Sequence, residues 1–197
     1  MTKEEIFAFY RDVIGIKSEK TAKQLAEGTR LMHRRKGYHL RNAGDKMRSI
    51  PFQLNGVSRC YIIDDEGRES VMGFYYEPGF PCIGGTGIRD KVLLNVDAVT
   101  EMDVLELSIS TLRRTMSFDP AVTEAIIRFM IEDRNKDYRW QIAMKTKFGE
   151  ELYLWFLEEY ADIVEVVTQK DIASFLGLKP QSLSRIKRSI EQKENSH

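Results

Sequence analysis

The sequence is poor in the residues from which metal sites, disulfide frameworks and membrane spans are built. Its 197 residues include two cysteines and three histidines, and no long apolar run occurs. Two cysteines cannot supply the four thiolates of an iron–sulfur cluster, and we interpret Cys60 and Cys82 as buried thiols rather than a redox pair. The start, Met-Thr-Lys-Glu-Glu, is charged and lacks the apolar core of a signal peptide. We therefore expect a cytoplasmic protein with no membrane segment and no cofactor.

Motifs of catalysis are missing as well. The sequence contains no nucleophile–base motif and no proper P-loop. A small roll of strands can be a metal-dependent cupin, whose metal site needs clustered His and Glu side chains. The histidines are His33, His39 and His197, and they form no His-x-His pair. We expect them at the surface or at strand ends, so the sequence does not favour an enzyme, and a cupin is the enzymatic alternative.

Charge is balanced over the whole chain but unevenly distributed along it. Thirty Lys and Arg residues match thirty Asp and Glu residues. Residues 150–167 contain six acidic residues and no basic one, whereas residues 168–190 contain five basic residues and one acidic one. Local positive charge is what contact with phosphate requires. The sequence therefore indicates nucleic-acid binding near the C-terminal end, and the alternative is a helical hairpin with a solvated basic face.

The first half of the chain changes from helical to strand-like patterning. Residues from about 3 to 32 have helical periodicity, in two segments separated by Gly15 and ending near Gly28. From about residue 31 to residue 108, short apolar or alternating runs are separated by turn residues. Asp64-Asp-Glu-Gly67 predicts a hairpin loop, and Val92–Val99 predicts a later strand. Many short strands at this spacing predict an antiparallel barrel or roll.

A short helix over residues 109–116 and a longer one from Asp119-Pro120 are predicted next, with Asp as N-cap and Pro at the first helical position. The longer helix is apolar on two neighbouring faces, which is more than one core face needs. We therefore expect a two-fold homodimer along it, with packing into the chain's own core as the alternative. The predicted dimer-interface residues are Val122, Ile126, Ile127, Phe129 and Met130, and Ile131 widens the same surface. The core predicted for the segment that follows consists of Trp140, Ile142, Met144, Phe148, Leu152, Leu154, Trp155, Phe156 and Leu157.

The stretch from Thr168 to Arg188 predicts two short helices joined by a tight turn. Thr168 suits an N-cap, Gly177 suits the left-handed residue after a helix, and Pro180 suits the first turn of the second helix. This is helix-turn-helix geometry, in which the second helix lies in the DNA major groove. The predicted DNA-binding residues are Lys170, Lys179, Gln181, Ser182, Ser184, Arg185, Lys187 and Arg188.

A roll, a long helix and a helix-turn-helix, in this order, resemble the Crp/Fnr family of bacterial transcription regulators. The similarity is most specific in residues 149–157, 170–178 and 182–186, and it is weaker in residues 55–59 and 64–69. The resemblance implies an α+β fold in three parts. These are a jelly-roll-like antiparallel β-roll with flanking helices (1–118), a dimerisation helix (119–145) and a helix-turn-helix domain (146–197). It also implies a homodimer on double-stranded DNA, with RNA polymerase and a small-molecule effector as further candidate partners.

One departure from the family lies in the expected effector pocket. The family's cyclic-nucleotide binders carry Gly-Glu-Leu and then an Arg with a small neighbour, and Val92 and Leu93 stand at the place of that pair here. An apolar pair cannot hold a buried phosphate charge, so we expect no response to cyclic nucleotides. The glycine cluster Gly84-Gly-Thr-Gly87 suits either a phosphate-cradling loop or a tight turn. The candidate effector-pocket residues are Cys82, Gly84, Gly85, Thr86, Val92 and Leu93.

The other departure follows the second helix of the helix-turn-helix. The family usually has a β-hairpin wing there, but residues 191–197 form a polar tail that cannot make one. A domain without a full wing loses backbone contacts to phosphate and should bind DNA more weakly. The alternative function is therefore a small-molecule or protein-responsive sensor with weakened or lost DNA binding. Arg185, Lys187 and Arg188 on the second helix disfavour that alternative.

Overall fold

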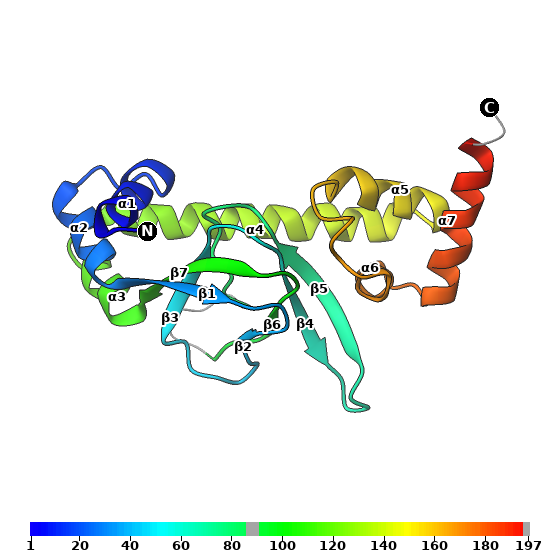
Figure 1. Ribbon diagram of the computed structural model, residues 1–197, viewed down its shortest axis with the longest axis horizontal. Coiled ribbons are helices and arrows are strands. Elements are labelled where there is room, and N and C mark those ends of the chain that lie inside the picture. Colours follow the sequence, from blue (N-terminus) through cyan, green and yellow to red (C-terminus); the bar gives the residue numbers. More distant parts are fainter. Residues whose placement is uncertain (86–90, 195–197) are drawn as a thin grey trace. The chain divides into compact units, whose positions relative to one another are not determined.

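The computed structural model describes residues 1–85 and 91–194 (Figure 1). The chain divides into two compact units, one made of residues 1–60 and 74–133 and the other of residues 61–73 and 134–197. Across the described residues, no helix combines the length and the apolar character needed to cross a membrane. The elements are α1 (Lys3–Ala8), the π-helical turn η1 (Phe9–Val13), α2 (Glu19–Glu27), β1 (Thr29–Arg34), β2 (His39–Arg41), β3 (Ser49–Gln53), β4 (Ser58–Ile63), β5 (Glu69–Tyr75), β6 (Asn95–Ala98), β7 (Met102–Ser108), α3 (Ile109–Met116), α4 (Pro120–Thr146), α5 (Gly149–Glu159), α6 (Gln169–Phe175) and α7 (Pro180–Glu194).

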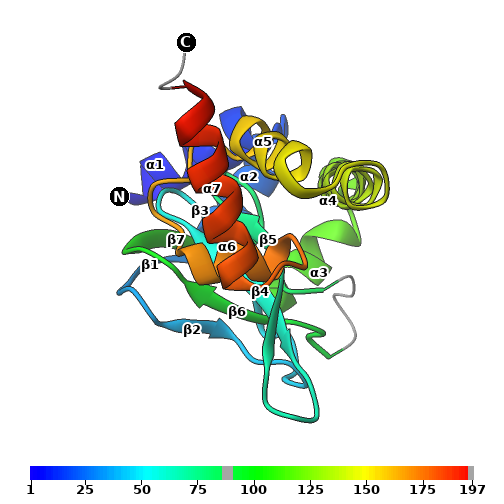
Figure 2. The same ribbon diagram turned by 90° about the vertical axis from the view of Figure 1, so that its right-hand side faces the viewer.

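The strands form two sheets, which can be followed in Figure 2. One sheet has the order β1-β7-β3, and both outer strands run antiparallel to β7. The other has the order β2-β6-β4-β5, in which β2 runs antiparallel to β6. The turn predicted at Asp64–Gly67 connects β4 to β5, and the Asp64 N–H donates to the Arg68 carbonyl at 3.0 Å. The α+β fold with an antiparallel roll is confirmed.

The core of the first unit lies between the β1-β7-β3 sheet and the helices. Side chains from α1, α2, α3 and the start of α4 are buried with residues of β3 and β7 in one cluster. Phe9 and Tyr10 meet Phe52 of β3 edge to face, with ring centroids 5.8 and 6.1 Å apart. Leu105 and Leu107 of β7 are buried in the same cluster. Burial of large aromatic and aliphatic side chains is the main stabilising term, so this cluster fixes the helices on the sheet.

Two sequence-based boundaries differ in part from the structure. The predicted end of the second helical segment near Gly28 is confirmed, because α2 ends at Glu27, but the outer limit near residue 32 was too late, because Thr29–Arg34 pairs with β7 as a strand. Gly28 lies at this change, where a Cβ would come within 2.6 Å of the Thr111 side chain, so only glycine fits without a shift. The strand predicted over Val92–Val99 is limited to β6, because the N–H groups of Leu93 and Leu94 donate to the Gly84 carbonyl.

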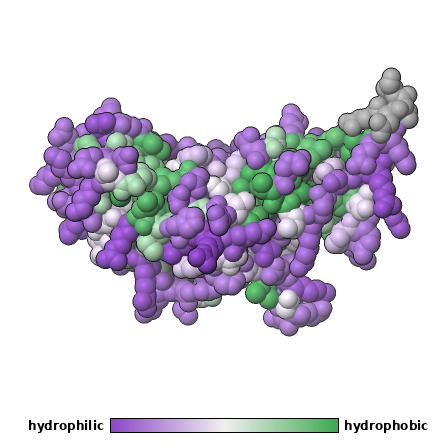
Figure 3. Space-filling view, in the orientation of Figure 1, coloured by the Kyte–Doolittle hydropathy of each residue, from purple (hydrophilic) through white to green (hydrophobic). Residues whose placement is uncertain are grey.

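The second unit contains α5, α6, α7, the C-terminal part of α4 and the outer part of the β4–β5 hairpin. Phe156 and Tyr160 stack at 5.0 Å, and Trp140 donates its indole N–H to the Phe175 carbonyl at 3.1 Å. The prediction of Leu152 and Phe156 as core residues is confirmed by their burial. Three other predicted core residues are exposed, because the cluster takes only one face of each helix; these are Ile142, Phe148 and Leu154. Apolar side chains accordingly reach the surface near α5 in Figure 3.

The long helix α4 begins at Pro120 and ends at Thr146, and the two compact units divide within it, between residues 133 and 134. The independence of the three parts, 1–118, 119–145 and 146–197, stays a prediction. The segment after Lys187 remains helical as far as Glu194.

Candidate nucleic-acid interface

The turn between α6 and α7 is fixed by its backbone. Gly177 follows α6 with φ +63°, in the left-handed region that glycine tolerates. Its N–H donates to the Ser174 carbonyl at 3.1 Å, and the Leu178 N–H donates to the Ala173 carbonyl at 2.8 Å. These two bonds form a Schellman motif, which satisfies carbonyls that the helix end leaves open. The predicted position of the turn at Gly177 is therefore confirmed.

The start of α6 is capped as the sequence predicts. The Thr168 hydroxyl oxygen accepts from the Asp171 N–H at 3.1 Å, and the same hydroxyl bonds to the Asp171 carboxylate at 2.7 Å. Ile172, Ala173 and Leu183 are fully buried, so the apolar sides of both helices face inward. With its inward face occupied, α7 presents the opposite face to solvent.

The exposed face of α7 carries the predicted DNA-binding side chains. Lys179 and Pro180 at the helix start are exposed, and Ile186 is half-buried on the inner side. Of the predicted set, only Lys187 is half-buried. The exposed members are Lys170, Lys179, Gln181, Ser182, Ser184, Arg185 and Arg188.

Arg185 has no carboxylate partner within the described residues. The alternative that Arg185 serves only to pair with the acidic segment before it is therefore not supported. Two other basic residues pair with that segment: the Lys193 ammonium lies 2.7 Å from the Glu150 carboxylate, and the Arg139 guanidinium lies 2.6 Å from the Glu159 carboxylate. An unpaired guanidinium on an exposed helix face is available for an external acceptor, such as a base edge or a phosphate.

A contact that the sequence did not indicate ties α6 to the β4–β5 hairpin. The Val71 N–H donates to the Ser174 hydroxyl oxygen at 3.0 Å, and that hydroxyl lies 3.5 Å from the Glu69 carbonyl. More than one hundred residues separate the two segments, and no local pattern carries such a contact. It fixes the outward-facing end of the hairpin against the helix that precedes the turn.

The candidate effector residues lie in different environments. Cys82 is buried beside the Gln53 side chain, with Sγ 3.3 Å from Oε1. The Gly84 carbonyl accepts from the N–H groups of Leu93 and Leu94, at 3.1 and 2.8 Å. Val92 is buried in the core cluster, whereas its neighbour Leu93 is 61% exposed. Thr86 lies outside the described residues, and the assignment of this set to an effector pocket stays a prediction.

The histidines of the roll each pair with an aspartate. His33 Nδ1 lies 2.9 Å from the Asp103 carboxylate, and His39 Nδ1 lies 2.6 Å from the Asp97 carboxylate. Hydrogen bonds from Asn55 and His33 hold the pKa of Asp103 below its usual value. In the part of the chain that the structure describes, no cluster of three His, Cys, Asp or Glu side chains could hold a metal ion.

The predicted dimer-interface residues divide between two sides of α4. Val122 is buried in the first unit's core, and Ile126 and Phe129 pack against it, so these three serve their own chain. Ile127, Met130 and Ile131 are about half exposed. Farther along the same helix, Tyr138 and Ile142 are also exposed. These five exposed residues, Ile127, Met130, Ile131, Tyr138 and Ile142, are called the α4 stripe below.

Comparison with known proteins confirms the resemblance seen in the sequence. The chain is 24% identical over 173 residues to the fumarate and nitrate reduction regulatory protein of Vibrio cholerae, covering 81% of this chain and 68% of the relative. It is 23% identical to electron transport regulator A of Shewanella oneidensis, covering 77% of this chain and 64% of the relative. The chain thus spans about two thirds of the length of these relatives. No family model matches it.

Solved structures share the fold. FixK2 from Bradyrhizobium japonicum superposes with a TM-score of 0.75 at 18% identity, over 84% of this chain and 86% of that one. A protein from Eubacterium rectale described as a transcriptional regulator of the Crp/Fnr family gives the same TM-score and identity over 96% and 88%. The global regulator CLP from Xanthomonas campestris, described as responsive to c-di-GMP, gives 0.73 at 13% identity over 90% and 93%. Relatives and neighbours alike are regulators rather than enzymes, in agreement with the expectation from the sequence.

Proposed function

We propose that this Crp/Fnr-like transcription regulator binds double-stranded DNA as a homodimer, with α7 as the helix that enters the major groove. The observation that carries the proposal is the exposed Arg185 without an ion-pair partner in the described residues, on a helix whose direction the Gly177 turn fixes. A recognition helix needs a fixed orientation on its domain and hydrogen-bond donors on its exposed face that are free to contact DNA, and α7 has both.

Different residues of α7 have different roles. Gln181 precedes Arg185 by one helical turn, so the two side chains lie on one face. Arginine suits a bidentate contact to guanine and glutamine one to adenine. Lys179 and Ser182 lie at the helix start, where phosphate contact is favoured, and Lys187 and Arg188 extend the positive charge.

The α4 stripe supports dimer formation. Contact between water and the apolar side chains that recur along one face of α4 is unfavourable. Two copies of the chain can bury these side chains against each other. A two-fold dimer also places two α7 helices on one DNA site, which multiplies the specificity of each.

Response to cyclic nucleotides is not part of the proposed function. Val92, at the place of the phosphate-binding arginine, is buried in the core, and an apolar side chain offers a phosphate no compensation for lost hydration. CLP, a regulator with this fold, is described as responsive to c-di-GMP, so an effector of another chemical class is compatible with the fold.

A gel-shift titration with DNA fragments from the protein's own promoter regions tests the function. We expect retarded complexes that weaken steeply with salt, since phosphate contacts release counterions. The variant Arg185→Ala should lose discrimination between fragments, while Lys193→Ala, whose side chain pairs with Glu150, should behave as the unmodified chain. Absence of retardation at low salt would favour the alternative of a sensor that acts through a protein partner.

A further inference from the structure

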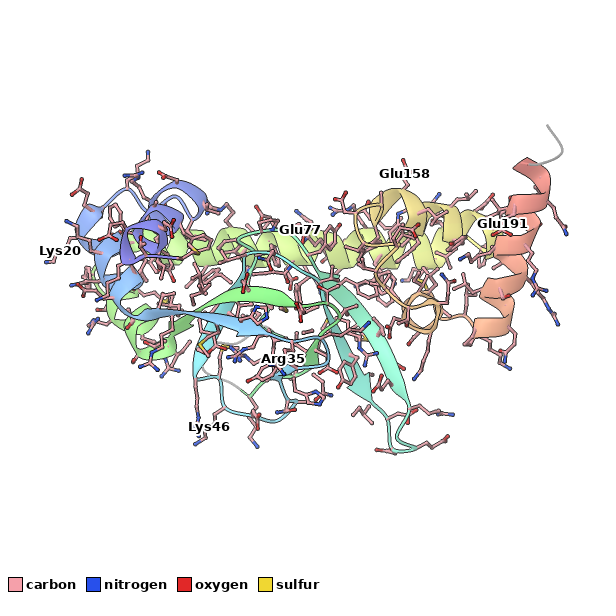
Figure 4. The ribbon with its side chains drawn as sticks, viewed as in Figure 1. Lys20, Arg35, Lys46, Glu77, Glu158 and Glu191 are labelled. Atoms are coloured by element: carbon pink, nitrogen blue, oxygen red, sulfur yellow. The ribbon has the colours of Figure 1, made fainter. Side chains whose placement is uncertain are left out.

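The most basic stretch of the chain lies in the roll, not in the helix-turn-helix. Residues 30–48, here called the basic segment, cover β1, the β1–β2 turn, β2 and the loop before β3. Its only acidic residue is Asp45. Figure 4 places Arg35 and Lys46 of this segment on the side of the roll around β2. The segment contains seven basic residues: Arg30, Arg34, Arg35, Lys36, Arg41, Lys46 and Arg48.

Two of these arginines, Arg34 and Arg41, turn inward and belong to one hydrogen-bonded network that includes Glu106. The Arg34 guanidinium donates to the Glu106 carboxylate at 2.8 Å. Arg41 donates to the Ser49 hydroxyl at 3.1 Å and to the Ser49 carbonyl at 2.8 Å. The Ser49 hydroxyl in turn lies 3.5 Å from the second oxygen of Glu106. A single connected network therefore contains both guanidinium groups and one carboxylate, which Arg34 contacts directly and Arg41 reaches through Ser49.

Among the described residues, this largely buried network contains two positive charges, on Arg34 and Arg41, and one negative charge, on Glu106. The Arg34 side chain is 13% exposed, and Arg41 forms no ion pair with a carboxylate of the described residues. Buried charges are normally paired, because hydration lost on burial must be replaced. Burial lowers the pKa of Arg41, with Glu106 opposing that effect. A bound anion would balance the excess positive charge of the two arginines.

Donors of the same two side chains are also unsatisfied. The Nε–H groups of Arg34 and Arg41 are buried and have no acceptor within the described residues. Buried donors without acceptors are uncommon and each costs stability, so a pair in one network needs an explanation. A guanidinium that offers Nε–H and a terminal N–H side by side is the preferred partner of a phosphate or carboxylate group.

We propose that a small oxyanion, a phosphate or carboxylate group carried by a small molecule, binds at Arg34 and Arg41 beside Glu106. The Tyr38 ring stacks on Arg34, with the guanidinium carbon 4.3 Å from the ring centroid, and is itself partly exposed, so it borders the approach to the site. The exposed cations around the site, Arg35, Lys36, Lys46 and Arg48, raise the local concentration of anions. Because the two inner arginines are largely buried, only a compact anionic head group reaches them.

The proposal is independent of DNA binding by α7. All residues of the site belong to the first unit, and none of them is among the residues assigned to DNA. The proposed site also uses other side chains than Val92 and Leu93, which stand by alignment at the family's phosphate-binding positions, although the Val92 N–H donates to the Asp45 carbonyl of the basic segment at 2.9 Å.

The direct test is titration with inorganic phosphate and, in a second arm, with malonate, at constant ionic strength set by chloride. Nitrogen-15 NMR of the arginine side chains should show saturable shifts of the Arg34 and Arg41 Nε–H signals, with the Arg48 signal unchanged. Calorimetry should give one site per chain in at least one arm, and the stronger arm identifies the head group. Saturable binding in neither arm, or equal shifts of all three arginine signals, would overturn the proposal.

Variants separate the site from the general basic charge. Arg41→Met should weaken binding by about tenfold or more, because charge-assisted hydrogen bonds are lost, whereas Arg48→Met removes the same charge from the exposed surface and should change affinity by less than about twofold. If Arg41→Met fails to fold by circular dichroism, Arg34→Met is measured in its place. An equal loss of affinity in Arg48→Met would show a diffuse patch and contradict a built site.

Discussion

Lys179 and Arg185 belong to one helix but are expected to contact different parts of DNA. Lys179 is exposed at the start of α7, where a point charge suits phosphate. We expect Lys179→Ala to weaken binding to all DNA sequences alike and to reduce the slope of log K against log salt by about one phosphate's share, roughly 0.9. Fluorescence anisotropy at several salt concentrations measures this slope. Lys193→Ala is the control, and a sequence-dependent loss in Lys179→Ala would contradict the phosphate assignment.

Gly177 controls the direction of α7 through its backbone. Its left-handed φ costs an L-residue about 1–2 kcal/mol, and a Cβ there would approach the Met144 methyl to 3.2 Å. We expect Gly177→Ala to lower the free energy of unfolding by about that amount, as measured by urea denaturation. Gly177→Asn should lose less, since asparagine tolerates the left-handed region better. Equal stability of both variants and the unmodified chain would show that the turn relaxes freely.

At the residue scale, the sequence predicts what depends on near neighbours. Thr168, Gly177 and Pro180 could be placed because caps and turns need particular residues at fixed offsets. The pairing of Ser174 with the hairpin and the network that connects Arg34 and Arg41 to Glu106 could not, because these contacts join segments distant in sequence. The charge of the basic segment can be counted in the sequence, but only the structure shows which of its arginines turn inward.

For the long helix α4, too, the sequence predicts local features but not the contacts that the helix makes with the rest of the chain. Its start was predicted from Asp119 and Pro120, and the Asp119 carboxylate does accept from the Ala121 N–H at 3.0 Å. Its two apolar faces were also visible, but periodicity does not say which face the chain itself covers. The structure assigns Val122 and Phe129 to the chain's own core and leaves the α4 stripe exposed.

The α4 stripe predicts the behaviour of a single substitution. Ile131→Glu places a charge in the proposed dimer contact, so we expect a shift from dimer to monomer at micromolar concentration in sedimentation velocity. Glu132→Ala changes the adjacent residue on another face of the helix and should remain dimeric. A monomeric unmodified chain under the same conditions, without DNA, would remove the basis for the homodimer.

For the whole molecule, the order of the predicted helices and strands along the chain indicated the fold more strongly than any single motif did. Strands of short alternating pattern, one long helix and a helix-turn-helix were enough to predict the α+β fold that the relatives share. Boundaries were imprecise by a few residues where tertiary pairing decides them, as at β1, which begins at Thr29 whereas the strand-like pattern was predicted from about residue 31. The effector pocket was the weakest prediction, because its residues were placed by alignment alone.

The apolar residues Val92 and Leu93, which align with the phosphate-binding pair of cyclic-nucleotide binders, predict how the whole chain responds to cyclic nucleotides. With Val92 buried in the core, titration with cyclic AMP or cyclic GMP should release no saturable heat in calorimetry. DNA affinity should likewise be unchanged by either nucleotide. Micromolar binding of one of them would show that another residue has taken over the role of the phosphate-binding arginine.

We propose that two copies of the chain read DNA through Arg185 on α7. Selection of bound sequences from random double-stranded DNA, with the unmodified chain and with Arg185→Ala in parallel, tests it most directly. We predict two half-sites related by two-fold symmetry and about one helical turn apart. Arg185→Ala should lose the preference at one symmetric pair of positions, with a cost of about 1–3 kcal/mol there, and keep the rest. An asymmetric or absent consensus, or one that Arg185→Ala leaves unchanged, would contradict the claim.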